Sequence, residues 1–165
     1  LEEMPVLKET KTLMLAPWSS ADLIIDNNMK PSYMFRLSLR DSLAMPKMLS
    51  TVAERGFSKV GLLLTNTGWG RSNNAAADAY AEKNSNPKIV HKAWYNFKDT
   101  SLIDKYDSLV KAGAQAIILV ANDDEAAILV KEVAALPAEK RVPILSHWGV
   151  AGGEFVKQEI GRAHV

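Results

Sequence analysis

The chain alternates between short runs of apolar residues and longer segments in which apolar residues recur at helical spacing. Residues 60–64 and 116–121 are almost entirely apolar, which is typical of strands buried on both faces of a parallel sheet. In residues 41–55 the apolar side chains fall at i, i+3, i+4 and i+7, and this spacing predicts an amphipathic helix. Gly56 follows at the position where a glycine commonly ends a helix.

From residue 59 to residue 147 the pattern predicts strands and helices in strict alternation. The expected strands are residues 59–65, 88–95, 116–121 and 142–147, and the helices between them are residues 71–83, 102–112 and 123–136. Each connection has about the length that a crossover between parallel strands needs. The fold class is therefore α/β, with a doubly wound parallel sheet. Thr100 or Ser101 is expected to cap the second helix, and a turn over residues 149–153 to open a further, truncated helix.

The segment before residue 59 fits this alternation less well. Residues 11–16 and 33–37 are expected to be short strands, and Ser19 or Ser20 can cap a short helix at residues 23–25. Pro46 is expected within the first turn or so of the helix over residues 41–55, where a proline is tolerated. We expect the end of a neighbouring lobe and its hinge crossing in residues 1–36, and a second-lobe α/β domain, cut at its C-terminus, in residues 37–157.

Both ends of the chain are expected to be cut. Residue 1 is Leu, and the pattern of a signal peptide is missing from the start of the sequence. Residues 158–165 fit no structural pattern and resemble the translation of a sequencing adapter, so we interpret them as a non-native tail.

Composition excludes several classes of function. The 165 residues are 47% apolar and 24% charged, with a net charge of +1 and no basic stripe that would indicate a nucleic-acid partner. No apolar run approaches the roughly 20 residues that span a bilayer. Because the sequence contains no cysteine, disulfides, thiol catalysis and cysteine-based metal sites are excluded.

No motif for catalysis, metal binding or cofactor binding emerges. Gly68-Trp69-Gly70 is half of a dinucleotide-binding fingerprint, but Asn73 stands where the third glycine should be, and the glycines are explained as a simple turn. His91 and His147 lack partners at metal-ligand spacing. The acids at residues 123–125 are explained by the start of a helix, where the helix dipole favours them. We therefore expect no catalytic residue, no metal and no cofactor.

Aromatic and polar side chains gather where the expected strands end. In open α/β sheets, ligands bind outside the carboxyl ends of the strands, and aromatic walls with a few polar groups are typical of small-molecule clefts. The side chains that follow the strands are Trp18, Ser19, Ser20, Asn66, Thr67, Trp69, Tyr95, Asn96, Asn122, Asp123, His147 and Trp148. We expect a small-molecule cleft at this edge.

An ordered set of segments resembles a known family. These segments are residues 16–21 (APWSSA), 33–37 (YMFRL), 60–71 (VGLLLTNTGWGR), 97–101 (FKDTS) and 113–120 (GAQAIILV). The set resembles the type I periplasmic solute-binding proteins of the branched-chain amino acid and amide ABC transporter class. The resemblance covers the chain to about residue 157, and it implies a periplasmic-binding-protein-like fold of which this chain holds mostly the second lobe and part of the first.

The resemblance also implies a ligand site. The turn over residues 17–21, here called the serine turn, would hold a ligand carboxylate through Ser19, Ser20 and Ala21, with Trp18 beside them. Trp69 would pack on the ligand from the opposite lobe, and Asn122 and Asp123 would add contacts after the fifth strand. Asn66 belongs to the same rim. Amino acid binders commonly place an acid where this sequence has Trp148, which favours an aromatic, aliphatic or carboxylate solute over an α-amino acid.

The implied function is extracytoplasmic, periplasmic binding of a small solute by two lobes that close on it. The solute, an amino acid, an amide or a carboxylate-like molecule, would be delivered to the permease of an ABC transporter. The protein would then not be an enzyme, and it would meet the membrane only through the permease or a lost anchor. Three alternatives stay open: a sensor domain of a membrane signalling receptor, the effector domain of a lactose-repressor-like regulator, and a nucleotide-dependent enzyme.

Overall fold

The apolar runs of the sequence form the two central strands of a parallel sheet. The computed structural model describes residues 3–151. The central strands are β3 (Lys59–Thr65) and β5 (Ala116–Val120), flanked by β4 (Lys88–Tyr95) and β6 (Ile144–Ser146). The order across the sheet is β4-β3-β5-β6, and every neighbouring pair is parallel. The predicted doubly wound α/β architecture is confirmed.

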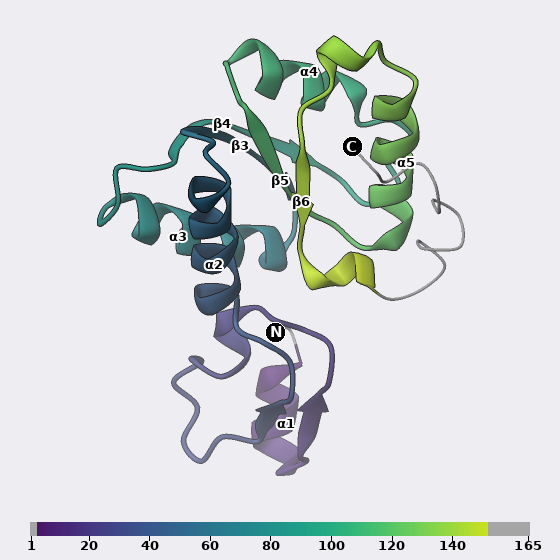
Figure 1. Ribbon diagram of the computed structural model, residues 1–165. Helices are drawn as coiled ribbons and strands as arrows, with labels where there is room; N and C mark the ends of the chain where they lie inside the picture. The colour runs from purple at the N-terminus through teal and green to yellow at the C-terminus, as the bar shows by residue number, and fades with distance from the viewer. Residues whose placement is uncertain (1–2, 152–165) are drawn as a thin grey trace.

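Two helices cover each face of this sheet (Figure 1): α2 (Asp41–Glu54) and α3 (Gly68–Ala81) on one, α4 (Ile103–Lys111) and α5 (Asp123–Ala134) on the other. Alternate residues of a strand point to opposite faces. Leu62 and Leu64 accordingly pack in the cluster under α2 and α3, and Leu63 packs under α4 and α5. All three side chains are fully buried. Burial on both faces explains why the strand is apolar at nearly every position.

A smaller N-terminal unit, residues 3–36, lies beyond one end of the sheet (Figure 1). It contains α1 (Met4–Thr10), β1 (Met14–Ala16), the 3₁₀ helix η1 (Asp22–Ile24) and β2 (Met34–Arg36). The two strands pair in parallel, and the small core consists of Leu7, Ala16, Ile24 and Met34. Helix α1 is not predicted from the sequence, because only one of its residues is buried and no apolar period marks it.

Several expected boundaries and caps were wrong, because groups distant in sequence satisfy the helix ends. Neither Thr100 nor Ser101 caps α4; instead the backbone N–H of Leu102 donates to the carboxylate of Glu132 at 2.8 Å. Neither serine of the serine turn caps η1; instead the N–H of Asp22 donates to the hydroxyl of Ser72 in α3 at 3.1 Å.

Gly68-Trp69-Gly70 is not a turn, as the sequence suggested, but the first turn of α3. Thr67 is the N-cap residue, and its hydroxyl accepts a hydrogen bond from the N–H of Gly70. Pro46 lies in the second turn of α2 rather than the first, and it has no N–H to give to the helix. Two short 3₁₀ helices, η2 (Ala138–Lys140) and η3 (Trp148–Ala151), complete the described chain. The expected tail, residues 158–165, and the end of the turn over 149–153 lie outside the described residues.

Residues 37–40 connect the two units, and Asp22 fastens this connection. The Asp22 carboxylate accepts hydrogen bonds from Nε of Arg40 at 2.7 Å and from the N–H and hydroxyl of Ser42, both at 2.9 Å. Partial burial raises the pKa of Asp22, but these hydrogen bonds and the charge of Arg40 outweigh burial and leave the pKa below its ordinary value. Because Arg40, the N-cap residue of α2, makes no side-chain cap, Asp22 caps that helix from the N-terminal unit.

The topology opens a crevice between β3 and β5. From β3 the chain turns to β4 on one side, and it then returns past β3 to reach β5 on the other. The loops that follow β3 and β5 therefore diverge, and this switch point is where open α/β sheets bind ligands. No helix within residues 3–151 is long and apolar enough to cross a membrane.

Gly70 should be required for the close contact between α3 and the end of β3. A Cβ atom at this residue would lie 1.8 Å from the carbonyl oxygen of Thr65, whereas a Cβ at Gly68 would have no atom within 4 Å. We expect Gly70→Ala to lower the free energy of unfolding by about 3 kcal/mol through overpacking. Gly68→Ala, the matched control, should change it by less than about 1 kcal/mol. Urea unfolding measures both, and equal effects would contradict the proposed contact.

Candidate ligand-binding site

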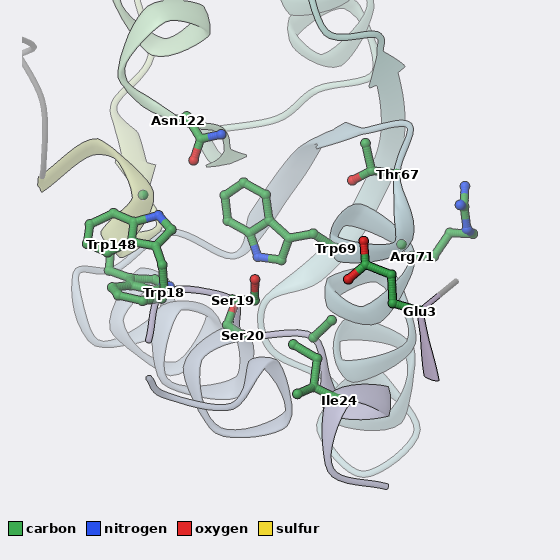
Figure 2. Close-up of a pocket in the computed structure, with 13 residues that line it drawn as sticks. Glu3, Trp18, Ser19, Ser20, Ile24, Thr67, Trp69, Arg71, Asn122 and Trp148 are labelled. Atoms are coloured by element: carbon green, nitrogen blue, oxygen red, sulfur yellow. The ribbon is translucent and has the colours of Figure 1, made fainter. Parts of the chain in front are cut away.

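A cavity of about 570 Å³ lies between the serine turn and the carboxyl edge of the sheet (Figure 2). Its wall combines both units of the chain. The lining residues are Glu3, Trp18, Ser19, Ser20, Ala21, Ile24, Thr67, Gly68, Trp69, Arg71, Asn122, Trp148 and Gly149. The volume falls within the range of about 300–1,000 Å³ that is typical of small-molecule sites.

Most of the residues expected at the site are brought together here. Trp18, Ser19, Ser20 and Ala21 enter from the N-terminal unit. Trp69 enters from the first turn of α3, Asn122 from the loop after β5, and Trp148 from η3, after β6. Segments more than a hundred residues apart in sequence thus share one cavity. Their common position follows from the parallel sheet, which gathers the ends of its strands at one edge.

Asn66 and Asp123 do not line the cavity. The Asn66 amide donates to Oδ1 of Asn96 at 3.0 Å and accepts from the guanidinium of Arg71, so it joins two loops at the exposed rim. Asp123 is the first residue of α5, where a carboxylate is stabilised by the helix dipole. Tyr95, another residue at a strand end, is buried, and its hydroxyl donates to the carbonyl of Val120 at 2.9 Å.

Two carbonyl groups of the serine turn accept hydrogen bonds from other parts of the chain. One guanidinium nitrogen of Arg36 donates to the carbonyls of Ser20 and Ala21, at 2.9 and 3.1 Å. The backbone N–H of Asp41 also donates to the carbonyl of Ser20, at 3.1 Å. In contrast, the Ser20 hydroxyl is buried and has no hydrogen-bond partner within residues 3–151. A buried hydroxyl without a partner costs free energy.

Two tryptophans from different units contact each other at one side of the cavity. The ring centroids of Trp18 and Trp148 are 4.4 Å apart, with the rings tilted by 37°. Trp18 follows β1, and Trp148 opens η3 after β6, so this contact bridges the N-terminal unit and the sheet. Figure 2 shows the two indoles on one flank of the cavity, with Trp69 near its centre.

Two buried residues, Asp41 and His147, contact the indole of Trp69. Its indole N–H donates to Oδ1 of Asp41 at 3.3 Å. Its ring meets the ring of His147 edge to face, with centroids 5.1 Å apart and an angle of 82°. The serine turn lies directly beneath Trp69 in Figure 2, so the indole and the hydroxyls share the same small space. The sequence showed His147 only as a histidine at a strand end, and it gave no role to Asp41.

Asn122 can face the cavity because another residue caps its helix. Asn122 is the N-cap residue of α5, yet its side chain makes no capping bond. The carboxylate of Glu125, three residues later, accepts from the backbone N–H of Asn122, as in one half of a capping box. Burial raises the pKa of Glu125, and the nearby acids Asp123 and Asp124 raise it further, while the backbone hydrogen bonds lower it. The Asn122 amide is therefore available to a ligand.

Several lining residues are absent from the ligand set that the family resemblance implies. Thr67 and Gly68 follow β3 directly, and Arg71 belongs to the first turn of α3, so a correct start for that helix would have placed all three. Gly149 allows close packing, since a Cβ there would lie 2.5 Å from the carbonyl oxygen of Ala121. No sequence signal marks Glu3, which enters from the N-terminal segment; the remaining residue is Ile24. Among residues 3–151, no group of three or more acidic or histidine side chains is arranged to hold a metal ion.

The sequence profile of a family described as periplasmic binding protein matches residues 3–160. The chain therefore belongs to this family. Some of the solved structures that share its fold are described as branched-chain amino acid ABC transporter proteins. No curated protein matches the sequence.

Solved structures share the fold at low sequence identity. A branched-chain amino acid ABC transporter protein from Thermus thermophilus with bound valine has a TM-score of 0.83 and 17% identity, over 98% of this chain and 41% of that one. An extracellular ligand-binding receptor from Rhodopseudomonas palustris HaA2 has a TM-score of 0.82 and 18% identity, over 95% and 43%. An ABC transporter solute-binding protein from the same organism, in complex with p-hydroxybenzoic acid, has a TM-score of 0.76 and 20% identity, over 89% and 39%.

The chain thus spans about two fifths of the length of these proteins. At such identities the likeness shows the fold, and the ligand must be inferred from the residues of this chain.

The contact between Trp18 and Trp148 should be visible by spectroscopy without any ligand. Two indoles with centroids 4.4 Å apart couple their electronic transitions and produce a paired positive and negative band in far-ultraviolet circular dichroism. We expect Trp18→Phe and Trp148→Phe each to remove this couplet in the full-length protein. Trp94→Phe, a change on the outside of β4, should leave it intact. A couplet that survives both substitutions at the cavity would show that the two rings do not meet in solution.

Proposed function

We propose that this chain is part of a non-enzymatic receptor that binds a small solute outside the cytoplasm for delivery to an ABC transporter permease. The single observation that carries the proposal is the cavity itself, which both units line and into which a buried, unpartnered Ser20 hydroxyl is built. In this proposal residues 1–36 end the first lobe and form the hinge crossing, and residues 37–157 belong to the second lobe. The family membership supports the extracytoplasmic location.

We propose an aromatic carboxylate as the ligand class. Three indoles, those of Trp18, Trp69 and Trp148, line the cavity and offer stacking surface for a planar ring. The hydroxyl of Ser20 can donate a hydrogen bond to a carboxylate. Arg71, at the rim of the cavity, is the only lysine or arginine among the lining residues. Trp148, rather than an acid, follows the last strand. The Rhodopseudomonas palustris protein solved with p-hydroxybenzoic acid offers a precedent within the fold.

An aromatic amino acid is the second candidate ligand, and Glu3 favours it. Glu3 is the only acidic residue among those that line the cavity, and Figure 2 shows its side chain with those of the other lining residues. A carboxylate in this position could pair with the ammonium group of an amino acid, while the serine turn holds the other end. The two candidates differ in one group, which makes them easy to separate by experiment.

Binding would draw the two units together around the ligand. The connection over residues 37–40 is short, and the cavity lies between the units it joins, which is the geometry of a hinge that closes on a ligand. Closure removes water from the cavity, and hydrogen bonds to Ser20 and Asn122 are stronger in the drier environment. The closed form would then be the one that the permease recognises.

Isothermal titration of the full-length protein with 4-hydroxybenzoate, phenylalanine and valine tests the ligand class. We expect 4-hydroxybenzoate to bind at least about tenfold more tightly than either amino acid, a difference of about 1.4 kcal/mol. Glu3→Gln serves as the control: it should not weaken 4-hydroxybenzoate binding, because it removes a negative charge that repels the carboxylate of this ligand. Tighter binding of phenylalanine that Glu3→Gln abolishes would establish the amino acid instead. Absence of binding by the whole panel would reject all three ligands.

Ser20→Ala should separate a ligand-binding role from a structural one. The hydroxyl has no partner to lose within the described chain, so the thermal stability of the ligand-free protein should not fall. Affinity for 4-hydroxybenzoate should fall by about tenfold or more, since a hydrogen bond to a charged group contributes about 1.5–3 kcal/mol. Ser50→Ala, on the exposed face of α2 where the hydroxyl bonds the carbonyl of Lys47, is the control. Unchanged affinity in Ser20→Ala would exclude this hydroxyl as a ligand donor.

A further inference from the structure

Beneath the cavity, Asp41, Trp69 and His147 form a polar cluster that we call the platform cluster. Asp41 is the first residue of α2, Trp69 lies in the first turn of α3, and His147 follows β6. Asp41 and His147 are almost completely buried, at 0% and 2% exposure. Only Trp69 reaches the cavity.

We infer that Asp41 is a positioning residue that fixes the ligand-facing orientation of Trp69. The importance of this role for ligand binding rests on the proposed function, whereas the contacts of Trp69 described here do not depend on it. Trp69 is partly buried, and an indole N–H that is withdrawn from water needs an acceptor. Oδ1 of Asp41 is that acceptor, at 3.3 Å. His147 then meets the indole ring edge to face. An acceptor at one edge and a ring against the indole together leave Trp69 a single orientation.

Asp41 also holds the opposite wall of the cavity. Its backbone N–H donates to the carbonyl of Ser20 at 3.1 Å, while its carboxylate holds Trp69. One residue therefore sets the distance between the hydroxyl donor and the stacking ring. Asp41 follows directly on the connecting residues 37–40, so this distance is defined at the point where the two units join.

Folding stability alone does not account for this cluster. Nε2 of His147 lies 3.4 Å from Oδ1 of Asp41, an ion-pair distance that is longer than most well-formed hydrogen bonds. Oδ2 of Asp41 and Nδ1 of His147 have no hydrogen-bond partner in the described part of the chain. Buried polar atoms without partners cost free energy, whereas an apolar pair of similar size would not. A role in holding Trp69 explains why a carboxylate stands at this position.

The consequence is a site whose aromatic surface is set before the ligand arrives. A free indole would have to be ordered when the ligand binds, and ordering a side chain on binding costs conformational entropy. Asp41 removes this cost by holding Trp69 in the empty protein. Loss of the acceptor should therefore be seen in the ligand-free state first and in affinity second.

Fluorine NMR of the full-length protein labelled with fluorotryptophan tests the inference directly. The resonance of Trp69 is assigned as the one that Trp69→Phe removes. In ligand-free protein, we expect Asp41→Leu to shift and broaden this resonance, because the indole then samples more than one orientation. Asp41→Asn, whose amide oxygen can still accept the indole N–H, should leave the resonance close to its original position.

Affinity for 4-hydroxybenzoate provides the second readout. We expect Asp41→Leu to weaken it about tenfold, and Asp41→Asn to change it by less than about threefold. Asp104→Leu is the control, since Asp104 is likewise an acid in the first turn of a helix, α4, but is exposed and does not line the cavity. If Asp41→Leu does not fold, Asp41→Ser replaces it, because the serine hydroxyl stops short of the indole.

The outcomes separate this inference from the proposed function. An unchanged Trp69 resonance in Asp41→Leu or Asp41→Ser would overturn the inference, whatever the protein binds. Equal disturbance by Asp41→Asn would also overturn it, because the charge and not the acceptor would then matter. If none of the three ligands binds but the resonance behaves as expected, the positioning role stands and the proposed ligand class falls.

Discussion

The site depends on how the serine turn is tied to the rest of the chain. Its carbonyl groups are taken up by Arg36 and by the backbone N–H of Asp41. Its following residue, Asp22, is bound through its carboxylate to the start of α2 and through its N–H to Ser72 of α3. The carbonyls of Ser20 and Ala21 are therefore satisfied within the chain, whereas the buried hydroxyl of Ser20 has no partner within residues 3–151. Without these hydrogen bonds, the serine turn would not be held in place as one wall of the cavity.

Much of the fold follows from periodicity, because burial on two faces leaves a strong signal. The runs at Leu62–Leu64 and Ile117–Leu119 need apolar residues at every position, since helices cover both sides of the sheet. Helix ends left a weaker signal. Glu132 bonds the start of α4 from thirty residues away, and Asp22 caps α2 from twenty residues away. Local sequence patterns cannot reveal such distant partners, and they indicate nearby serines and threonines as caps instead.

The cavity was predictable to the extent that topology alone determines it. A parallel sheet brings the ends of its strands to one edge, and this rule was enough to gather Trp69, Asn122 and Trp148. This rule could not predict which side chains at that edge are already engaged in hydrogen bonds to other residues. Asn66 looked as suitable as Asn122, but its amide is engaged with Asn96, whereas Glu125 caps α5 and leaves Asn122 available. Asp41 could not be found at all, because its role exists only where α2, α3 and β6 meet.

The distribution of tasks between the two units suggests an order of events in binding. The C-terminal unit holds the stacking surface, because Trp69 and its supports Asp41 and His147 all belong to it. The N-terminal unit holds the hydroxyl donors and Trp18. A ligand could therefore settle first on the ring of Trp69, whose orientation is set in advance, and the serine turn would follow as the units approach. The contact between Trp18 and Trp148 joins the two units at one flank of the cavity.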